Sequence, residues 1–177
     1  MKLATPFSLR IYLMVLSLLT SVALIGCDSN SNLSQKSDIP AFQLSELNGK
    51  ITSNTDLNGK VAVINFWATS CTTCVKEMPH MIEVYKEFAP QGLDFLAIAM
   101  SYDPPMYVMN FAKTRELPFR VAMDSEGKAA KAFGKVELTP TTIVIDRRGR
   151  ILKTYVGEPN WQEFKTVIKA ALAEQPA

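Results

Sequence analysis

The most informative segment of this chain is Val61-Ala-Val-Ile-Asn-Phe-Trp67-Ala-Thr-Ser-Cys71-Thr-Thr-Cys74. Its first part, 61–67, is an apolar run of the length and character of a buried strand. After Cys74 the apolar side chains recur at helical spacing as far as Phe88. The first cysteine is therefore predicted to lie where a strand ends and a helix begins.

The two cysteines of this stretch are predicted to form a redox-active pair. Residues three apart on a helix share a face, so the sulfurs of Cys71 and Cys74 can approach without straining the backbone. Free N–H groups and the positive dipole end at the helix start favour an anion, which makes Cys71 the expected nucleophile. Cys74, one turn deeper, is the expected resolving thiol. The alternative, half of a structural zinc site, needs two further ligands, and only Cys27 and His80 remain.

The motif as a whole resembles a known family. The strand, Trp67-Ala68-Thr69, the C-x-x-C and Glu77-Met78-Pro79 are similar to the TlpA/ResA-like branch of the thioredoxin superfamily. The resemblance implies an α/β thioredoxin fold with an N-terminal β-hairpin and a central strand-helix insertion. It also implies a membrane-tethered thiol-disulfide oxidoreductase of the extracytoplasmic space. Ser70 stands where the family commonly has Trp and Thr73 where it commonly has Pro, and these positions affect redox potential and partner fit.

The amino terminus has the pattern of a targeting segment. Lys2 and Arg10 precede an apolar stretch of 15 residues, 11–25. A short apolar segment behind a positively charged start predicts a secretory signal, and 15 residues are too few for a comfortable membrane-spanning helix. Gly26-Cys27 at its end resembles the lipobox of bacterial lipoproteins, in which the cysteine is lipidated. An uncleaved membrane anchor is the alternative. The expected organisation is a signal peptide at 1–26, a lipidated Cys27 with a flexible tether to residue 38, and a thioredoxin-like domain at 39–177.

Charge and cysteine content restrict the function classes. The 177 residues include 19 basic and 17 acidic ones, and removal of the signal leaves equal numbers of each. A neutral mature chain gives no support for nucleic-acid binding. With Cys27 assigned to the anchor, two cysteines remain in a compartment that favours oxidation, which suits redox chemistry. The expected location is the cell membrane, lipid-anchored and facing the periplasm or extracytoplasmic space.

The rest of the chain alternates strands and helices. Asn48-Gly49, between the segments 41–47 and 50–52, predicts a hairpin. A second apolar strand is predicted at 93–100, and its connection to the first through a helix implies a right-handed parallel crossover. Cys71 would then lie at the carboxyl ends of the strands, where open α/β sheets have their functional sites. Further elements are expected as a helix at 106–116, a strand at 119–123, a helix at 128–133, strands at 142–146 and 151–156, and a last helix with apolar residues from 161 to 172.

Two more positions are assigned to substrate binding. The resemblance implies a cis-proline facing the C-x-x-C, and Thr139-Pro140 ahead of a β-branched strand matches it. The Thr139 backbone would then pair with an extended substrate segment. An ordinary trans proline at a strand start is the alternative. Trp67 is expected to pack beside the disulfide and shape the docking surface, with ordinary core packing as the competing interpretation.

Glu77 is a candidate catalytic residue. It follows Cys74 by three positions and shares its helix face, so its carboxylate could relay the proton that Cys74 must lose. Related proteins use a glutamate here in that role. The alternative is a solvated glutamate paired with Lys76 or Lys86. His80, the one histidine, is expected at the surface.

The resemblance implies thiol-disulfide exchange without a cofactor. Strong oxidants of this fold carry a histidine inside the C-x-x-C, which lowers the pKa of the nucleophilic cysteine. This chain has Thr72 and Thr73 there, which offer only hydroxyls, so we expect it to act as a reductant or an isomerising partner. The implied partners are disulfide-containing clients, such as apocytochrome c or copper-site proteins, and an upstream membrane thiol reductase. The chain is expected to be a monomer.

Two other functions share this fold. A copper-binding or delivery module would use soft thioether donors, although such relatives carry a C-x-x-x-C and a distant histidine. A thiol peroxidase would need proline at 64 or 67, where this chain has Ile64 and Trp67, and is excluded. The candidate thioether donors are Met78, Met81, Met100, Met106 and Met109.

Overall fold

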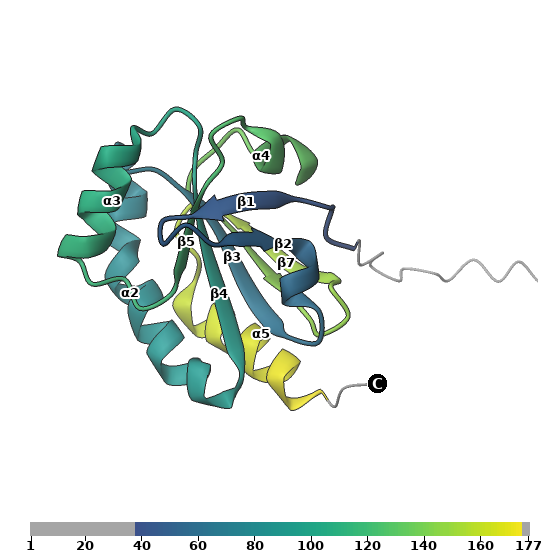
Figure 1. Cartoon of the computed structure of the whole chain (residues 1–177). Helices are drawn as coiled ribbons and strands as arrows, with labels where there is room; N and C mark the ends of the chain where they lie inside the picture. Colours follow the sequence, from purple (N-terminus) through teal and green to yellow (C-terminus); the bar gives the residue numbers. More distant parts are fainter. Residues whose placement is uncertain (1–37, 175–177) are drawn as a thin grey trace, which may run out of the picture. The chain divides into compact units, whose positions relative to one another are not determined.

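The apolar run forms β3 (Val61–Trp67), and every one of its side chains is buried. The computed structural model describes residues 38–174. In it β3 lies between β4 (Leu93–Ala99), which is parallel, and β6 (Thr141–Ile145), which is antiparallel. Both edges of β3 are therefore hydrogen-bonded, and both faces are covered. The sheet has seven strands in the order β2-β1-β5-β4-β3-β6-β7 (Figure 1).

Side chains of β3 alternate between two apolar cores, one on each face of the sheet. Val63 and Trp67 point into the first, and Ile64 and Phe66 into the second. The first core also contains residues of α2 (Thr72–Phe88), α3 (Pro105–Thr114) and α5 (Trp161–Ala173). The second is closed by α4 (Lys128–Ala132) and the 3-10 turn η1 (Asn54–Leu57), on the other side of the strands in Figure 1.

The predicted hairpin and insertion are both present. β1 (Gln43–Glu46) and β2 (Ile51–Ser53) are antiparallel. Gly49 between them has a φ of 83°, a left-handed conformation that glycine adopts without strain. β1 pairs with β5 (Arg120–Met123), and β5 lies parallel to β4. The inserted strand thus joins the hairpin to the thioredoxin core.

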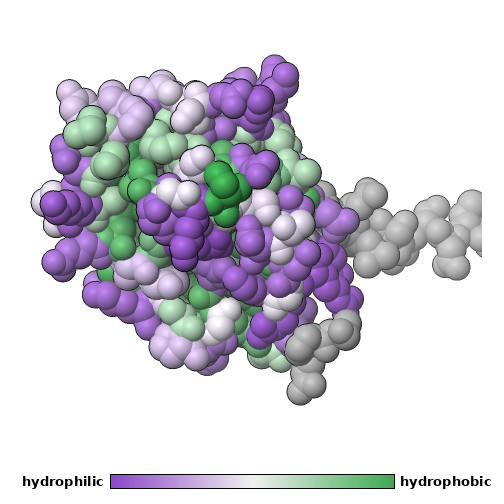
Figure 2. All heavy atoms as spheres, viewed as in Figure 1, coloured by the Kyte–Doolittle hydropathy of each residue, from purple (hydrophilic) through white to green (hydrophobic). Residues whose placement is uncertain are grey.

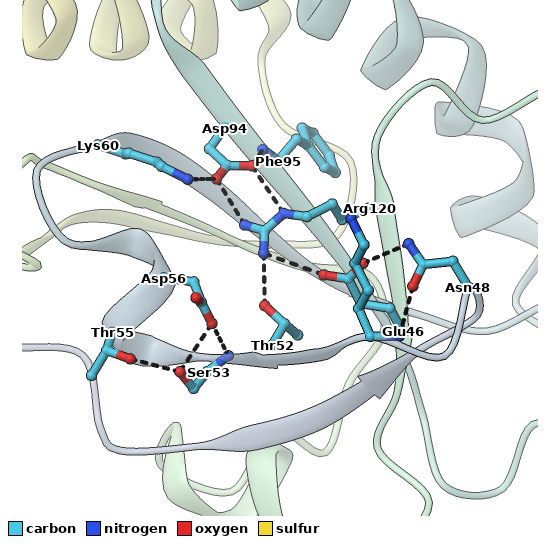
Figure 3. A network of polar contacts seen from close by, with 11 residues as sticks. Glu46, Asn48, Thr52, Ser53, Thr55, Asp56, Lys60, Asp94, Phe95 and Arg120 are labelled. Carbon is cyan, nitrogen blue, oxygen red and sulfur yellow. Dashed lines mark hydrogen bonds and ion pairs between the residues drawn. The ribbon is translucent and has the colours of Figure 1, made fainter.

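A partly buried polar network holds the hairpin to that core (Figure 3). The guanidinium of Arg120 on β5 donates two hydrogen bonds to Asp94, at 3.1 and 2.8 Å. It also donates to Thr52 Oγ1 at 2.6 Å and contacts Glu46 Oε1 at 3.5 Å. Glu46 is nearly buried, so this cation compensates a carboxylate that water cannot reach.

The remaining elements agree with the sequence expectation to within two residues. α2 continues through Pro79 and is followed by η2 (Ala89–Gln91). β7 (Ile151–Val156) pairs with β6 at the sheet edge. Cys27 and the segments predicted as signal peptide and tether lie outside the described residues, except for residue 38. None of the helices between residues 38 and 174 is long and apolar enough to cross a membrane.

The face seen in Figure 2 is mainly hydrophilic, with apolar side chains exposed over the hairpin and over α3. They include Ile51 on β2 and Met106 and Met109 on α3. Single exposed apolar residues of this kind are normal on soluble domains and need no partner.

Candidate active site

Four segments meet at one edge of the sheet because of the strand directions. β3, β4 and β7 end at this edge, and β6, which runs the other way, begins there. Backbone hydrogen bonds link the segments in pairs: Met100 N–H donates to the Trp67 carbonyl at 3.0 Å, and Gly157 N–H to the Pro140 carbonyl at 2.8 Å. Residues from four distant parts of the chain therefore surround the start of α2.

The two cysteines form a disulfide at that helix start, with their Cα atoms 5.2 Å apart. Cys71 is the N-cap of α2, and its Sγ accepts a hydrogen bond from the Cys74 backbone N–H at 3.1 Å. Cys71 is partly exposed, whereas Cys74 is fully buried. Cys71 is therefore the more accessible of the two cysteines. These features agree with the roles predicted for the two sulfurs.

The proline loop faces the disulfide. The Thr139–Pro140 peptide bond is cis, which excludes the trans alternative. The Thr139 carbonyl oxygen lies 3.4 Å from Cys71 Sγ, and the Thr139 hydroxyl lies 3.3 Å from that of Tyr102. Thr139 is partly exposed beside the reactive sulfur, and a backbone in this position could pair with an extended client chain.

Glu77 is buried on the same helix face as Cys74, which rules out the solvated alternative. Its Oε1 accepts a hydrogen bond from Asn65 Nδ2 at 3.2 Å. Burial raises the pKa of Glu77 to about 8, the Asn65 hydrogen bond opposes this shift, and the charge of Glu158 adds to it. At neutral pH the side chain is therefore mainly protonated.

Sequence reasoning missed three residues that organise the site. Asn65, the one amide in the apolar run, also donates to Thr142 Oγ1 at 2.9 Å on the neighbouring strand. A polar residue in a fully buried strand was the available signal. Asp103 accepts hydrogen bonds from the backbone N–H and the hydroxyl of Thr69, both at 2.6 Å, and so fixes the loop before Cys71. The third is Glu158, and no local pattern marks it or Asp103.

Trp67 combines the two interpretations given for it. It belongs to the first core together with Cys74, and its ring packs against Phe111 of α3 with centroids 5.1 Å apart. Its side chain is fully buried, so any effect on client docking stays a prediction and could only be indirect. The reason is the alternation along β3, which directs residue 67 under α3 and away from solvent.

The methionines do not form a donor cluster. Met78 and Met81 are in the first core, Met100 is in the second, and Met106 and Met109 are exposed on α3. The copper-module alternative therefore loses the sequence feature that favoured it. As expected, His80 is at the surface, where its ring lies 4.9 Å from that of Trp161.

Comparisons with known proteins agree with this geometry. Residues 34–172 match the family model described as Redoxin. The chain is 36% identical over 126 residues to the thiol-disulfide oxidoreductase ResA of Bacillus subtilis strain 168, covering 71% of this chain and 69% of the relative. It is 33% identical over 132 residues to ResA of Bacillus thuringiensis subsp. konkukian, covering 75% of each.

A solved structure shows the same fold. The thiol:disulfide interchange protein of the thioredoxin family from Chlorobium tepidum superposes with a TM-score of 0.71 at 31% identity. The match covers 79% of this chain and 99% of that protein.

The raised pKa of Glu77 predicts a specific pH dependence of stability. The unfolded side chain ionises near 4.5 and the folded one near 8, so the free energy of unfolding falls as the pH rises between these values. Glu77→Gln should remove this pH-dependent part, roughly 5 kcal/mol over the whole interval at about 1.4 kcal/mol per pKa unit. Urea unfolding of the oxidised protein at several pH values measures it. The exposed Glu83→Gln is the control, and parallel pH curves for wild type and Glu77→Gln would contradict the expectation.

Proposed function

This chain belongs to the Redoxin family and is a thiol-disulfide oxidoreductase, and we propose that it acts as a reductase tethered to the membrane outside the cytoplasm. One observation carries the proposal: a partly exposed Cys71 caps α2 while its buried partner Cys74 lies one turn deeper. This asymmetry supports attack by Cys71 and resolution by Cys74.

The first step is attack on the client. The Cys71 thiolate displaces one sulfur of the client disulfide, forming a mixed disulfide and releasing a client thiolate that takes up a proton. The Cys74 N–H that points at Cys71 Sγ and the free N–H groups of the first turn stabilise the thiolate. The Thr139 carbonyl, 3.4 Å away, would hold the extended client segment in line.

The second step is resolution. Cys74 loses its proton and attacks Cys71 Sγ, which closes the protein disulfide and releases the second client thiolate. Two electrons have then passed from the protein dithiol to the client. The ionised fraction of Glu77, which grows as the pH approaches its pKa of about 8, would accept the Cys74 proton, because Glu77 lies on the same buried helix face. A membrane thiol reductase upstream would restore the dithiol.

The clients are proposed to be extracytoplasmic proteins with cysteine pairs, such as apocytochrome c or copper-site proteins. Exposed apolar side chains next to the reactive edge support a protein client. Leu138 precedes the cis-proline loop with 65% of its surface exposed, and Tyr102, which contacts Thr139, is 57% exposed. Such side chains contribute to protein contacts more than scattered polar ones do.

The cysteine variants test the exchange mechanism. Cys71→Ser should lower the reduction of insulin by on the order of 10³-fold or more, because the nucleophile is lost. Cys74→Ser should leave attack intact and trap covalent client adducts, which non-reducing gels detect. The double variant is the control and should capture nothing. Activity that survives Cys71→Ser would exclude this nucleophile.

The midpoint potential of the dithiol tests the direction of electron flow. Thr72 and Thr73 are exposed and place only hydroxyls between the sulfurs, so the reduced form gains less stabilisation than in a strong oxidant. The potential should lie nearer the roughly −270 mV of thioredoxin than the roughly −120 mV of DsbA. Equilibration with glutathione and with dithiothreitol buffers measures it. A value near the oxidising end would reverse the proposed direction.

Lipid labelling tests the tether. Cells expressing the full chain should incorporate labelled palmitate, and Cys27→Ser should abolish the label and release the protein from the membrane fraction. Cys71→Ser is the matched control and should keep the label. A label that persists in Cys27→Ser would exclude this residue as the anchor.

A further inference from the structure

The carboxylate of Asp103 binds the loop that leads to Cys71. Its Oδ2 accepts a hydrogen bond from the Thr69 backbone N–H at 2.6 Å, and its Oδ1 accepts one from the Thr69 hydroxyl, also at 2.6 Å. Asp103 is only 2% exposed, so water competes little for these bonds. Both oxygens of one buried side chain are thus bonded to a single residue, two positions before the reactive cysteine.

Burial makes this carboxylate costly for the fold. Within residues 38–174 the ion pairs involve other acidic residues, so no lysine or arginine compensates the charge of Asp103. A buried charge without a cation lowers stability unless its hydrogen bonds offset the lost hydration. Local costs of this kind are expected where a side chain serves the function of the protein.

The backbone that carries Asp103 is the short loop between β4 and α3. The Met100 N–H donates to the Trp67 carbonyl at 3.0 Å, which joins this loop to the end of β3, and the Asp103 N–H donates to the Met100 carbonyl at 3.0 Å. On the other side, the Pro104 carbonyl accepts the Tyr107 N–H at 2.9 Å as α3 begins. The carboxylate is therefore attached to backbone that is held at both ends.

The segment that Asp103 binds sets the position of Cys71. Residues Ala68–Cys71 form a turn, closed by a hydrogen bond from the Cys71 N–H to the Ala68 carbonyl at 3.2 Å. Thr69 lies inside this turn, so its two bonds to Asp103 hold the turn in place. The turn places Cys71 at the N-cap of α2, where its Sγ accepts the Cys74 N–H at 3.1 Å.

We propose that Asp103 is a positioning residue for attack on the client: by binding Thr69 it keeps Cys71 Sγ at the helix start, where backbone N–H groups stabilise the thiolate. The inference rests on the proposed function of Cys71 as the nucleophile. A displaced sulfur would lose the Cys74 N–H and its alignment with the client disulfide. Misplacing a reacting atom by about 1 Å can lower a rate by roughly 10²-fold. Loss of Asp103 should therefore slow the attack itself.

The experiment measures attack in the full chain with Cys27→Ser, so that Cys71 and Cys74 are its only thiols. The reduced protein is mixed with dithiodipyridine, a small uncharged disulfide, and stopped-flow absorbance records the release of thiopyridone. The Cys71 thiolate displaces the first thiopyridone as the mixed disulfide forms, and Cys74 displaces the second as the protein disulfide closes. Urea unfolding of the oxidised form measures the stability of each variant in parallel.

Asp103→Ala removes both bonds to Thr69 and should lower the rate constant of attack by about 10-fold or more. Asp124→Ala is the matched control. Asp124 is an equally buried aspartate, and its carboxylate accepts the N–H groups of Ala129 and Ala130 in α4, at 3.0 and 2.8 Å. This control should lose stability and keep the wild-type rate. An unchanged rate in Asp103→Ala, or an equal loss of rate in both variants, would overturn the proposal.

Variants of Thr69 test the route, and they carry the test alone if Asp103→Ala does not fold. Thr69→Val loses the hydroxyl bond and should slow attack by about 3-fold. Thr69→Ser keeps both donors and should match the wild type. Combining Thr69→Val with Asp103→Ala should add nothing to the loss from Asp103→Ala, because both changes remove the same contact. A wild-type rate in Thr69→Val, or additive losses in the double variant, would contradict a role through Thr69.

Cys71→Ser separates this inference from the function on which it rests. If this variant still releases the first thiopyridone at the wild-type rate, Cys71 is not the nucleophile and the proposed function fails. If that release is lost but Asp103→Ala attacks at the wild-type rate, only the role of Asp103 fails.

Discussion

The position of α2 relative to β3 is the constraint behind the whole site. The helix begins a few residues after the strand ends, and Cys71 is its N-cap. The strand is held on both sides by β4 and β6 and on both faces by apolar packing, so its end is a fixed point. Because the Cys71 sulfur accepts the Cys74 N–H, the same short turn satisfies a helix terminus and places the second sulfur within bonding distance. The hydrogen bond that caps the helix is thus the same one that would stabilise a thiolate at Cys71.

On the same helix, the fold buries the carboxyl group of Glu77, which does not add to stability at neutral pH. Glu77 has one hydrogen bond, from Asn65, and burial keeps its proton on well above the usual range of a glutamate. A neutral carboxyl is less costly to bury than a charged one, which makes the arrangement tolerable. A group that exchanges its proton near neutral pH is also what a resolving thiol requires.

The rest of the site comes from segments that the sheet topology brings to the same edge. Asp103 fixes the loop before Cys71, the Thr139 carbonyl faces the reactive sulfur, and Glu158 joins the loop after β7 to the active-site helix. At the far side of the sheet, Arg120 holds the hairpin against β4 and β5. The inserted strand β5 ends beside β4 at the same edge, where Asp124 N–H donates to the Ala99 carbonyl at 2.9 Å.

The sequence by itself determined the local features of this protein. The strand-to-helix junction at Cys71, the more shielded Cys74, the Asn48-Gly49 hairpin and the helix face shared by Glu77 and Cys74 follow from spacing and periodicity within a few residues, whereas the burial of Glu77 came from the structure. Such patterns are set by backbone geometry, which neighbouring residues fix. The cis state of Pro140 could be predicted only from the family resemblance, because no local sequence rule distinguishes the cis from the trans isomer.

Only the tertiary structure decided which side chains meet across the fold. It buried Trp67 under α3, divided the methionines between two cores and the surface, and brought Glu158 to a lysine 82 positions earlier in the chain. Asn65 and Thr142 are 77 positions apart, yet they are directly paired across two strands. Contacts of this kind depend on strand order and register, which come from the packing of the whole sheet and leave no periodic signal in the sequence.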